Sequence, residues 1–383
     1  MLIHRAVYEE EHSLFRDAVR GFIKAEVLPH FTAWEEAGMV ERRFWQRAGE
    51  AGILCPQIAD SHGGAGGNFK HNAVVIEEFA YAGLAGPLSD LTVHSDVGAS
   101  YIEDLGNEEQ KQHWLPRLAS GETVCAVAMT EPGTGSDLQA VRTRATPTEA
   151  GFRISGNKTF VSNGQHCDLV IVVARTSDAP GAKSISLILV EAERAGFNRG
   201  RKLDKLGQLS ADTSELFLED IEVPRGNLLG REGAGFASLM QQLPQERLAI
   251  ALTSMAAAQR AFDITVDYVR NRKAFGQAIG DFQNTRYKLA DLKTELSVGW
   301  AFVDQCLDKH VRRQLDSTQA SIAKLWCSEM QGRLVDQCLQ FFGGYGFMRE
   351  YEICRLYADA RVQRIYGGTS EIMRELISRS LAA

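Results

Sequence analysis

The sequence predicts a mainly α-helical protein with a central β-domain, because its hydrophobic pattern changes period twice along the chain. Apolar residues recur at helical spacing from Glu9 to about Leu118, short apolar runs follow from about Thr123, and helical spacing returns after Pro224. The 383 residues, 44% of them hydrophobic and 24% charged, suffice to bury the cores of about two or three domains. We therefore predict a helical domain over residues 1–122, a β-domain over 123–230 and a second helical domain over 231–383.

The N-terminal segment places its apolar residues on single faces of the expected helices. Phe15, Val19 and Phe22 are spaced to lie on one side of a helix, and residues 74–80 supply a second apolar helix. The glycine-rich segment 60–68 interrupts this pattern. A plain connection between two helices explains that segment better than a binding loop does.

The middle segment has the composition of β-strands. Runs rich in Val, Ile and Leu cover residues 169–173, 185–190 and 215–219, and Gly, Asp and Pro separate them. After the glycines at 230–235, long helices are predicted again up to the C-terminus. One of their apolar faces consists of Leu289, Leu292, Leu296 and Val303. We see no internal repeat or low-complexity linker, so we expect the three parts to pack as one unit.

The charge of the chain argues against nucleic acid as a partner. The formal net charge is −7, and lysines and arginines are interleaved with acidic residues. No apolar run approaches the roughly 18 residues of a membrane span, and acidic residues at 9–11 follow too early for a signal peptide, so we expect a cytoplasmic protein. The seven cysteines are scattered without a C-x-x-C pair, which predicts reduced, mostly buried thiols and no metal site.

Residues 127–137 combine hydroxyl side chains with a glycine-rich turn. Gly133 and Gly135 allow close approach of the backbone, and Thr130 and Ser136 offer hydrogen bonds to the rim of a polar heterocycle. Taken alone, this composition favours an ordinary surface turn, and it is not the G-x-G-x-x-G pattern of dinucleotide-binding folds. A turn that cradles a planar cofactor is the alternative.

Four further motifs support the cofactor turn. They are GNKTFVSNG at 156–164, RKAFG at 272–276, QFFGGYG at 340–346 and IYGGTSE at 365–371. With residues 127–137, they stand in the order and spacing of one family, and the chain closely resembles the acyl-CoA dehydrogenases over nearly its whole length. The resemblance implies an acyl-CoA dehydrogenase-like fold with a helical N-terminal domain, a middle β-barrel and a C-terminal four-helix bundle, assembled as a homotetramer.

The resemblance also implies FAD as the cofactor, held between the β-domain and the helices and shared with a neighbouring subunit. Phe160 stands where the family often has Trp and would lie against the isoalloxazine, although a strand Phe is otherwise more often a core residue. Arg272 would fork onto the diphosphate, whereas a lone arginine near a helix end is usually solvated. Residues 340–344 would come from the other subunit, and Thr369 or Ser370 is also expected to cap the last helix. The implied contacts are Val127, Met129, Thr130, Gly135, Ser136, Phe160, Val161, Ser162, Arg272, Phe275, Gln283, Gln340, Gly343, Gly344, Thr369 and Glu371.

The position of the catalytic base follows from a departure from the common family pattern. Many members carry the base directly after the Tyr of the last motif, but here Gly367 follows Tyr366. A subgroup that includes long-chain and isovaleryl-type enzymes places it on a C-terminal helix instead, and LPQERL at 243–248 resembles that variant. We therefore predict Glu246 as the base. A solvated helical Glu paired with its basic neighbour is the alternative, and Glu371 and Glu375 are the other candidates for the base.

The resemblance implies that the backbone N–H of Gly367 polarises the thioester carbonyl together with a flavin ribityl hydroxyl. The missing side chain at this position is expected to leave free volume near Cα. Arg247 would either hold the ionised Glu246 or contact the pantetheine arm, and Lys183 would meet the CoA 3′-phosphate unless it is a solvated loop residue. The expected substrate contacts are Ser136, Lys183, Pro244, Arg247, Gly367 and Gly368.

Three functions are compatible with these motifs. The first is α,β-dehydrogenation of a saturated acyl-CoA, with electrons passing to an electron-transfer flavoprotein. The second is a flavin-dependent oxidase or monooxygenase, which the Glu246 match disfavours, and the third is a non-catalytic FAD-bound scaffold. Small residues at 83–100 either wall a deep acyl pocket or let helices pack closely, so acyl chain length and branching remain open.

Overall fold

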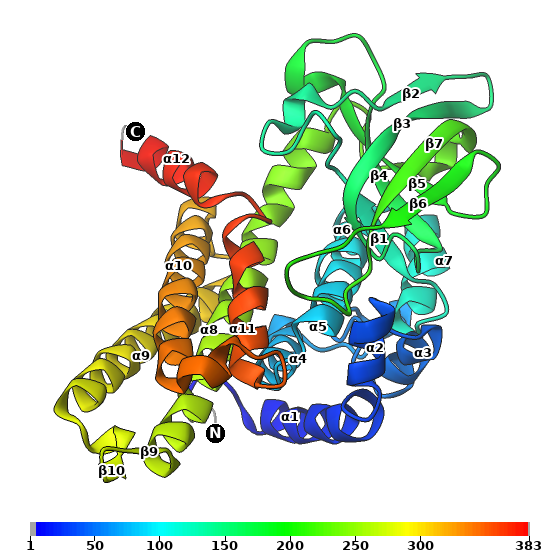
Figure 1. Ribbon diagram of the computed structural model, residues 1–383. Coiled ribbons are helices and arrows are strands. Elements are labelled where there is room, and N and C mark those ends of the chain that lie inside the picture. The colour runs from blue at the N-terminus through cyan, green and yellow to red at the C-terminus, as the bar shows by residue number, and fades with distance from the viewer. Residues whose placement is uncertain (1–4, 382–383) are drawn as a thin grey trace.

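Helices form the N-terminal part of the protein. The computed structural model describes residues 5–381, so the outer ends of the first and last predicted domains, 1–4 and 382–383, lie outside the described residues (Figure 1). The N-terminal helices are α1 (Glu10–Phe22), α2 (Phe31–Ala37), α3 (Arg42–Glu50), α4 (Phe69–Tyr81), α5 (Ala85–Thr92), α6 (Ser100–Leu105) and α7 (Glu108–Ala119), with π-helical segments η1 (Ile23–Val27) and η3 (Val93–Ala99). The segment 60–68 connects α3 to α4, as expected, and contains the short 3-10 turn η2 (Asp60–His62).

The middle part is one sheet with the strand order β6-β7-β3-β2-β4-β5-β8, and β1 pairs in parallel with β4. Its strands are β1 (Cys125–Ala128), β2 (Arg144–Pro147), β3 (Gly151–Ser162), β4 (Leu169–Arg175), β5 (Ile185–Glu191), β6 (Phe197–Lys202), β7 (Thr213–Pro224) and β8 (Leu228–Leu229). The predicted runs at 169–173, 185–190 and 215–219 all lie in strands.

Strand β4 shows why its sequence is apolar without alternation. From Leu169 to Ala174, its odd-numbered residues pack into the core shared with the helices, and its even-numbered residues pack into the separate core of the β-domain. A strand buried on both faces has no solvent side that would favour polar residues.

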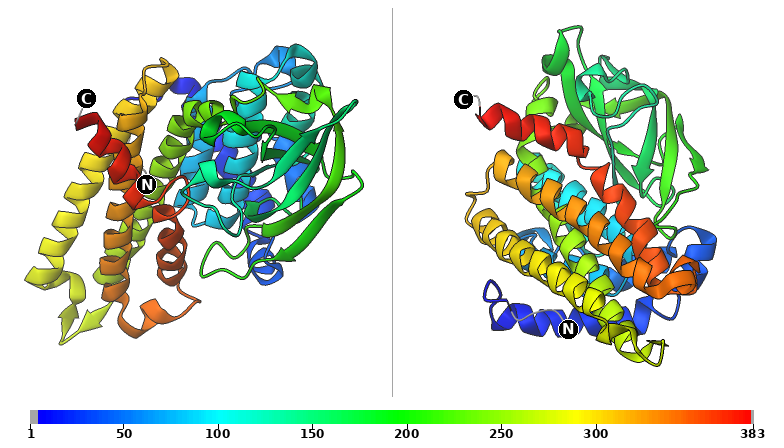
Figure 2. Two further views of the ribbon diagram at one scale, coloured as in Figure 1. Left: turned by 90° about the horizontal axis from the view of Figure 1, so that it is seen from above. Right: turned by 60° about the vertical axis from the view of Figure 1, so that its left-hand side comes forward.

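The C-terminal part consists of long helices that pack along one another (Figure 2). They are α8 (Gly235–Asn271), α9 (Gln283–Val311), α10 (Ser317–Phe342) and α11 (Glu352–Ala360), followed by α12 (Ser370–Leu381), and the small hairpin β9 (Lys273–Ala274) and β10 (Gln277–Ala278) joins α8 to α9. This order of helices, sheet and helices confirms the predicted fold class. None of the helices between residues 5 and 381 combines the length and hydropathy that a membrane crossing requires.

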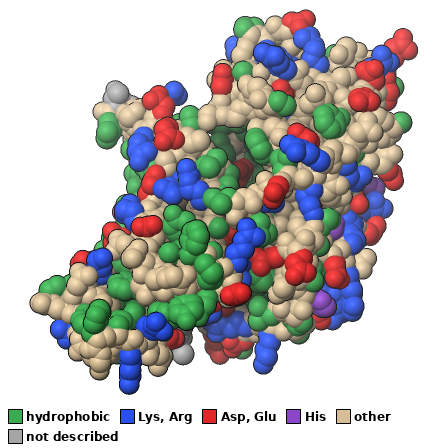
Figure 3. All heavy atoms as spheres, in the orientation of Figure 1, with side chains coloured by type: hydrophobic (Ala, Val, Ile, Leu, Met, Phe, Trp, Pro, Cys, Tyr) green, Lys and Arg blue, Asp and Glu red, His purple; other side chains and the backbone are tan. Residues whose placement is uncertain are grey.

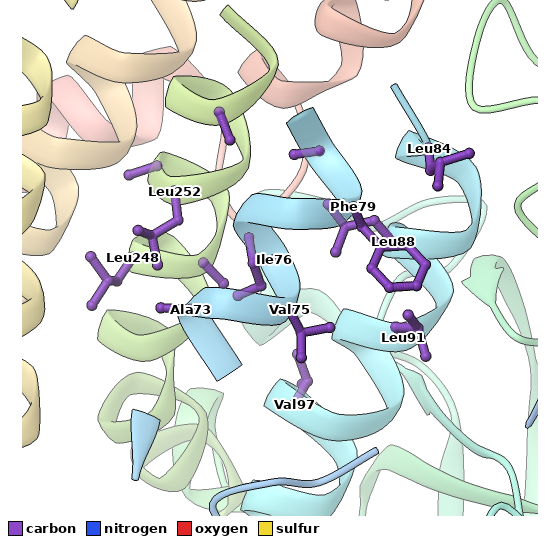
Figure 4. Close-up of a cluster of buried hydrophobic side chains, with 14 of the residues drawn as sticks. Ala73, Val75, Ile76, Phe79, Leu84, Leu88, Leu91, Val97, Leu248 and Leu252 are labelled. Carbon is purple, nitrogen blue, oxygen red and sulfur yellow. The ribbon is translucent and has the colours of Figure 1, made fainter. Parts of the chain in front are cut away.

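One hydrophobic core joins α8 to the N-terminal helices. Leu248 and Leu252 of α8 face Ala73 and Ile76 of α4, and α4 in turn packs on α5 and η3 (Figure 4). Helix α4 is buried nearly all round because it lies between these neighbours. The same packing places the middle of α8 beside α6 and η3, and it therefore holds the candidate base against the N-terminal domain.

Candidate active site

Glu246 lies about three turns into α8 and faces Tyr101 on α6. The Tyr101 hydroxyl donates a hydrogen bond to Glu246 Oε1 at 2.6 Å. Tyr101 is fully buried and Glu246 is half-buried. Burial raises the pKa of Glu246 above its ordinary value, whereas the Tyr101 hydrogen bond and the charge of Arg247 act in the opposite direction. A partly desolvated carboxylate held in place in this way is suited to accept a proton.

Ile250 links Glu246 to Gly367. It follows Glu246 by four residues on α8 and therefore lies on the same helix face. A Cβ atom built on Gly367 would lie only 2.3 Å from Ile250 Cδ1. The fold thus brings Gly367 to within about one helical turn of the carboxylate. It also corrects the expected free volume, because the Ile250 side chain fills that space.

The backbone of the last motif presents a donor beside this pair. Gly367 has a φ of +64°, and within residues 5–381 its N–H makes no hydrogen bond. The neighbouring Tyr366 N–H, by contrast, donates to Val362 O at 3.2 Å. Ile372 N–H donates to Thr369 Oγ1 at 3.3 Å, so Thr369 caps α12 as predicted. The free amide of Gly367 is therefore available to a substrate carbonyl. Figure 3 shows the surface hollowed between the sheet and the segment that leads into α12.

Residues 127–136 and 156–164 form one unit that includes the ends of β1 and β3. Thr159 N–H donates to Thr130 O at 3.0 Å, which ties the second motif to the first. Of the predicted cofactor contacts in this unit, Val127, Met129, Thr130 and Ser162 are half-buried, and Gly135 and Ser136 are exposed. The side chain of Val161 is 1% exposed and packs in the β-domain core, so only its backbone can reach a cofactor.

Phe160 is not a core residue. Its side chain is 68% exposed, its φ is +56°, and the register of β3 with β7 shifts between Lys158 and Val161. A β-bulge re-aims a side chain in this way. The usual expectation for a strand Phe is therefore wrong here, and the ring is presented at the surface.

A buried ion pair holds this unit together and was not predicted. Lys158 Nζ donates to Glu131 Oε1 at 2.9 Å, and the two side chains are 0% and 6% exposed. Burial would raise the pKa of Glu131, but Lys158 and the Thr143 hydroxyl lower it below its ordinary value. Lys158 also donates to Met129 O and Val173 O. Both residues stand within the motifs, but the sequence did not indicate that they pair.

The Arg272 side chain lies at the far end of the helical bundle. Its guanidinium carbon is 5.6 Å from the centre of the Tyr345 ring, so the structure groups it with residues 340–344. Helix α8, which begins against β5 at Gly235 and ends just before Arg272, has 37 residues and is therefore about 55 Å long. The structure thus places Arg272 beside the segment that contains residues 340–344. The predicted contacts gathered at this exposed end are Arg272, Phe275, Gln283, Gln340, Gly343 and Gly344.

The expected substrate contacts divide into two groups. Lys183 is exposed on the loop between β4 and β5, close to the loop after Ser136, since an added Cβ at Gly181 would meet Gln139 at 3.1 Å. Pro244 is half-buried and precedes the base by two residues. Arg247 differs, because it is 3% exposed and donates to hydroxyls of α10, a position that does not support contact with a pantetheine arm.

The other candidate carboxylates are less suited to act as the base. Glu371 is exposed at the start of α12 and lies 3.9 Å from Arg374. Glu375 forms an exposed ion pair with Arg379 at 2.8 Å, so it points away from the site. All seven cysteines are free, and every one except Cys354 is buried, which confirms the prediction of mostly buried thiols.

Comparison with known proteins identifies the family of the chain. Residues 9–122, 126–221 and 233–382 match the N-terminal, middle and C-terminal domains of acyl-CoA dehydrogenase. The chain is 48% identical to the long-chain specific acyl-CoA dehydrogenase of Sus scrofa over 98% of this chain and 88% of the relative.

Solved structures give the same result. The acyl-CoA dehydrogenase from Geobacillus kaustophilus is 42% identical with a TM-score of 0.97, covering 99% of this chain and 100% of that one. An acyl-CoA dehydrogenase complexed with FAD from Bacillus anthracis is 31% identical with a TM-score of 0.92, covering 98% of this chain and 67% of that one. The chain belongs to the acyl-CoA dehydrogenase family.

Proposed function

We propose that this protein is an FAD-dependent acyl-CoA dehydrogenase that converts a saturated acyl-CoA into the trans-2-enoyl-CoA. The proposal rests on one observation. Ile250 follows Glu246 by one turn of α8, and its side chain lies beside Gly367, whose N–H is free, so the carboxylate and this amide belong to the same site. Glu246 takes the α-proton, and the Gly367 amide polarises the thioester carbonyl. When bound, FAD accepts the β-hydride. Its electrons then pass to an electron-transfer flavoprotein.

The residues near the sheet fit a flavin. Phe160 offers an exposed aromatic ring, and added Cβ atoms at Gly133 and Gly135 would meet nothing within 4 Å, so the turn has room beside it. The half-buried Met129 and Thr130 supply an apolar surface and a hydroxyl next to this turn. We assign the ring-binding role to this unit and the diphosphate and nucleotide contacts to the group around Arg272.

The ring-binding unit belongs to the β-domain, whereas Arg272 follows the far end of α8, a helix about 55 Å long, so we infer that one cofactor does not contact both groups within a single chain. We therefore infer that a second subunit completes each site and that the protein is a homotetramer. The exposed aromatic surface around the end of α10, visible at the lower left of Figure 3, supports an interface there. Phe275 is 97% exposed and Phe347 is 79% exposed in the isolated chain. We further propose a cytoplasmic location.

Replacing Arg272 by alanine should weaken FAD retention by about 10- to 100-fold, as expected for the loss of a charge-assisted phosphate contact. The helical fold should remain, because the Arg272 side chain is exposed. Equilibrium dialysis of FAD and circular dichroism measure the two effects. Arg270→Ala, two residues earlier on the same helix and also exposed, is the matched control and should retain FAD normally.

Anaerobic mixing with a panel of acyl-CoA esters tests the proposed function. We expect a yellow protein with about one FAD per chain whose flavin absorbance bleaches with at least one ester and recovers with an electron-transfer flavoprotein. Rapid reoxidation by air would indicate an oxidase or monooxygenase instead. A protein that binds FAD but bleaches with no ester would indicate a non-catalytic scaffold. The same panel shows which acyl chain length and branching the protein prefers.

Replacing Tyr101 by phenylalanine should move the acid side of the pH profile for flavin reduction to higher pH. The carboxylate of Glu246 acts as base only above its pKa, and the Tyr101 hydrogen bond lowers that pKa. Without the hydroxyl the pKa rises further, so the rate falls on the acid side and recovers at higher pH. Stopped-flow absorbance across a pH series measures this, with the exposed Tyr357→Phe as control. Superimposable profiles for the Tyr101 variant and the unchanged protein would contradict the role of Tyr101.

A further inference from the structure

Two buried cationic side chains lie near the Gly367–Gly368 turn without a carboxylate partner. Lys324 on α10 is 0% exposed, and Arg247 on α8 is 3% exposed. Within residues 5–381, no aspartate or glutamate oxygen lies within 4.0 Å of the nitrogens of either side chain. Buried charges are usually paired, so two buried cations that act on each other electrostatically and have no ion pair call for a functional explanation.

Lys324 contacts the turn directly. Its Nζ donates to the carbonyl oxygen of Gly368 at 2.6 Å. Across the described residues, this is the only hydrogen bond that the backbone of Gly367 or Gly368 makes. The two glycines have φ of +64° and +94° and carry no side chains that would limit the backbone. The ammonium group therefore restrains this turn by a hydrogen bond, and the side chains of Ile250 and Met373 pack beside it.

The charge of Glu246 acts on Arg247, but the two side chains form no ion pair. Arg247 Nη1 donates only to the hydroxyls of Ser317 and Ser321, both at 3.2 Å, and its Nε has no partner. Burial and the charge of Arg247 lower the pKa of Lys324 to about 8, while Glu329 and Glu371 act in the opposite direction.

Neither acid neutralises Lys324. Glu329 accepts a hydrogen bond from Ser370 at 2.7 Å and lies 3.6 Å from Arg364, so it is already engaged. Glu371 is largely exposed. Lys324 therefore forms no ion pair with either acid, although both act on it electrostatically.

We propose that Lys324 is a positioning residue for the dehydrogenation, which holds the Gly367 amide toward the thioester oxygen and, with Arg247, favours negative charge there. The inference rests on the proposed function. When the α-C–H bond breaks, the proton goes to Glu246 and the electron pair moves toward the carbonyl. As the β-hydride leaves for the flavin, the electron pair from the α-C–H bond forms the α,β double bond. A fixed donor and a desolvated cation both stabilise the transient charge on oxygen.

Three substitutions separate the two parts of this role. Lys324→Met removes both the donor and the charge, Lys324→Gln keeps a donor without the charge, and Lys324→Arg keeps both. Lys205→Met is the matched control, since Lys205 also donates to a backbone carbonyl, that of Ala211 at 2.7 Å, but on the loop between β6 and β7. Each variant is prepared as the FAD-loaded protein.

Two measurements are made on every variant. The first is the rate of flavin reduction by a saturated acyl-CoA in an anaerobic stopped flow, with the dissociation constant obtained from its concentration dependence. The second needs no turnover: acetoacetyl-CoA binds as an enolate, and its pH-dependent absorption gives the apparent pKa of the bound ligand. A merely structural lysine would not move that second readout.

For Lys324→Met we expect reduction slower by about 10²–10³-fold with substrate binding changed only a few fold, as for the loss of an oxyanion donor. The apparent pKa of bound acetoacetyl-CoA should rise, Lys324→Gln should lie between, and Lys324→Arg should restore most of the rate. Unchanged rates and an unchanged enolate pKa in the Met and Gln variants would overturn the inference. If Lys324→Met does not fold, equal behaviour of the Gln and Arg variants would overturn it. A wild-type protein that neither bleaches nor binds acetoacetyl-CoA would instead remove the proposed function itself.

Discussion

Glu246→Gln should lower the rate of flavin reduction by about 10⁴-fold or more while FAD and acyl-CoA still bind. The amide keeps the size of the side chain and can still accept the Tyr101 hydrogen bond, which spans 2.6 Å in the protein. It cannot take a proton from the α-carbon. Single-turnover reduction followed at the flavin absorbance, with ligand titration as the binding readout, measures both quantities.

Glu375→Gln is the control for this experiment. Glu375 lies on α12 in an exposed ion pair, so its neutralisation should leave the rate unchanged. An active Glu246→Gln protein would place the base elsewhere, with Glu371 as the next residue to test. It would also remove the main reason to assign the chain to the subgroup with the base on α8.

The structure also limits a rescue of this variant by Gly367→Glu. The sequence alone suggested that a carboxylate at 367 could replace Glu246, because many relatives carry their base there. An added Cβ would lie 2.3 Å from Ile250 Cδ1, and the φ of +64° is unfavourable for a side chain. We therefore expect rescue only when Ile250→Ala is introduced as well. Activity in the triple variant but not in the double variant would confirm that Ile250 occupies the space.

Lys158→Met should destabilise the protein by about 3–5 kcal/mol, because it leaves the carboxylate of Glu131 buried without its cation. Both side chains are nearly inaccessible, and the ion pair connects the two motifs assigned to the flavin ring. Loss of FAD should accompany the loss of stability. Chemical denaturation monitored by circular dichroism and flavin fluorescence follows the two effects together.

The double variant Lys158→Met with Glu131→Gln tests the cause. Removing both charges should recover part of the lost stability, since no buried ion then lacks a partner. Arg153→Met breaks the exposed Arg153–Glu222 pair on the same sheet and should leave the denaturation midpoint nearly unchanged. If Lys158→Met matched that control, the buried pair would not stabilise the sheet as we infer.

Much of the fold and part of the site could be predicted from residue patterns. The run at 169–173 indicated a strand because all of its residues are apolar. Both faces of this strand are buried, so an apolar residue is favoured at every position. Glu246 was found because the LPQERL segment, read with the vacant position at Gly367, distinguishes one subgroup from the rest of the family. Such signals depend on residues close in sequence or on the order of motifs, and both can be seen in one amino-acid sequence.

The contacts that organise the site were decided by tertiary structure. Tyr101 and Glu246 are 145 residues apart, and Lys324 and Gly368 are 44 apart, so no local periodicity relates them. The orientation of Phe160 depends on a register shift against β7, and the space beside Gly367 depends on how α8 packs against the last turn. The sequence by itself determined the order of helices and strands and the chemical type of the site, because hydrophobic period and motif spacing are local properties. Which side chain holds the base, fills the space and restrains the turn was settled only by packing, since each of these contacts joins elements that meet in the folded chain alone.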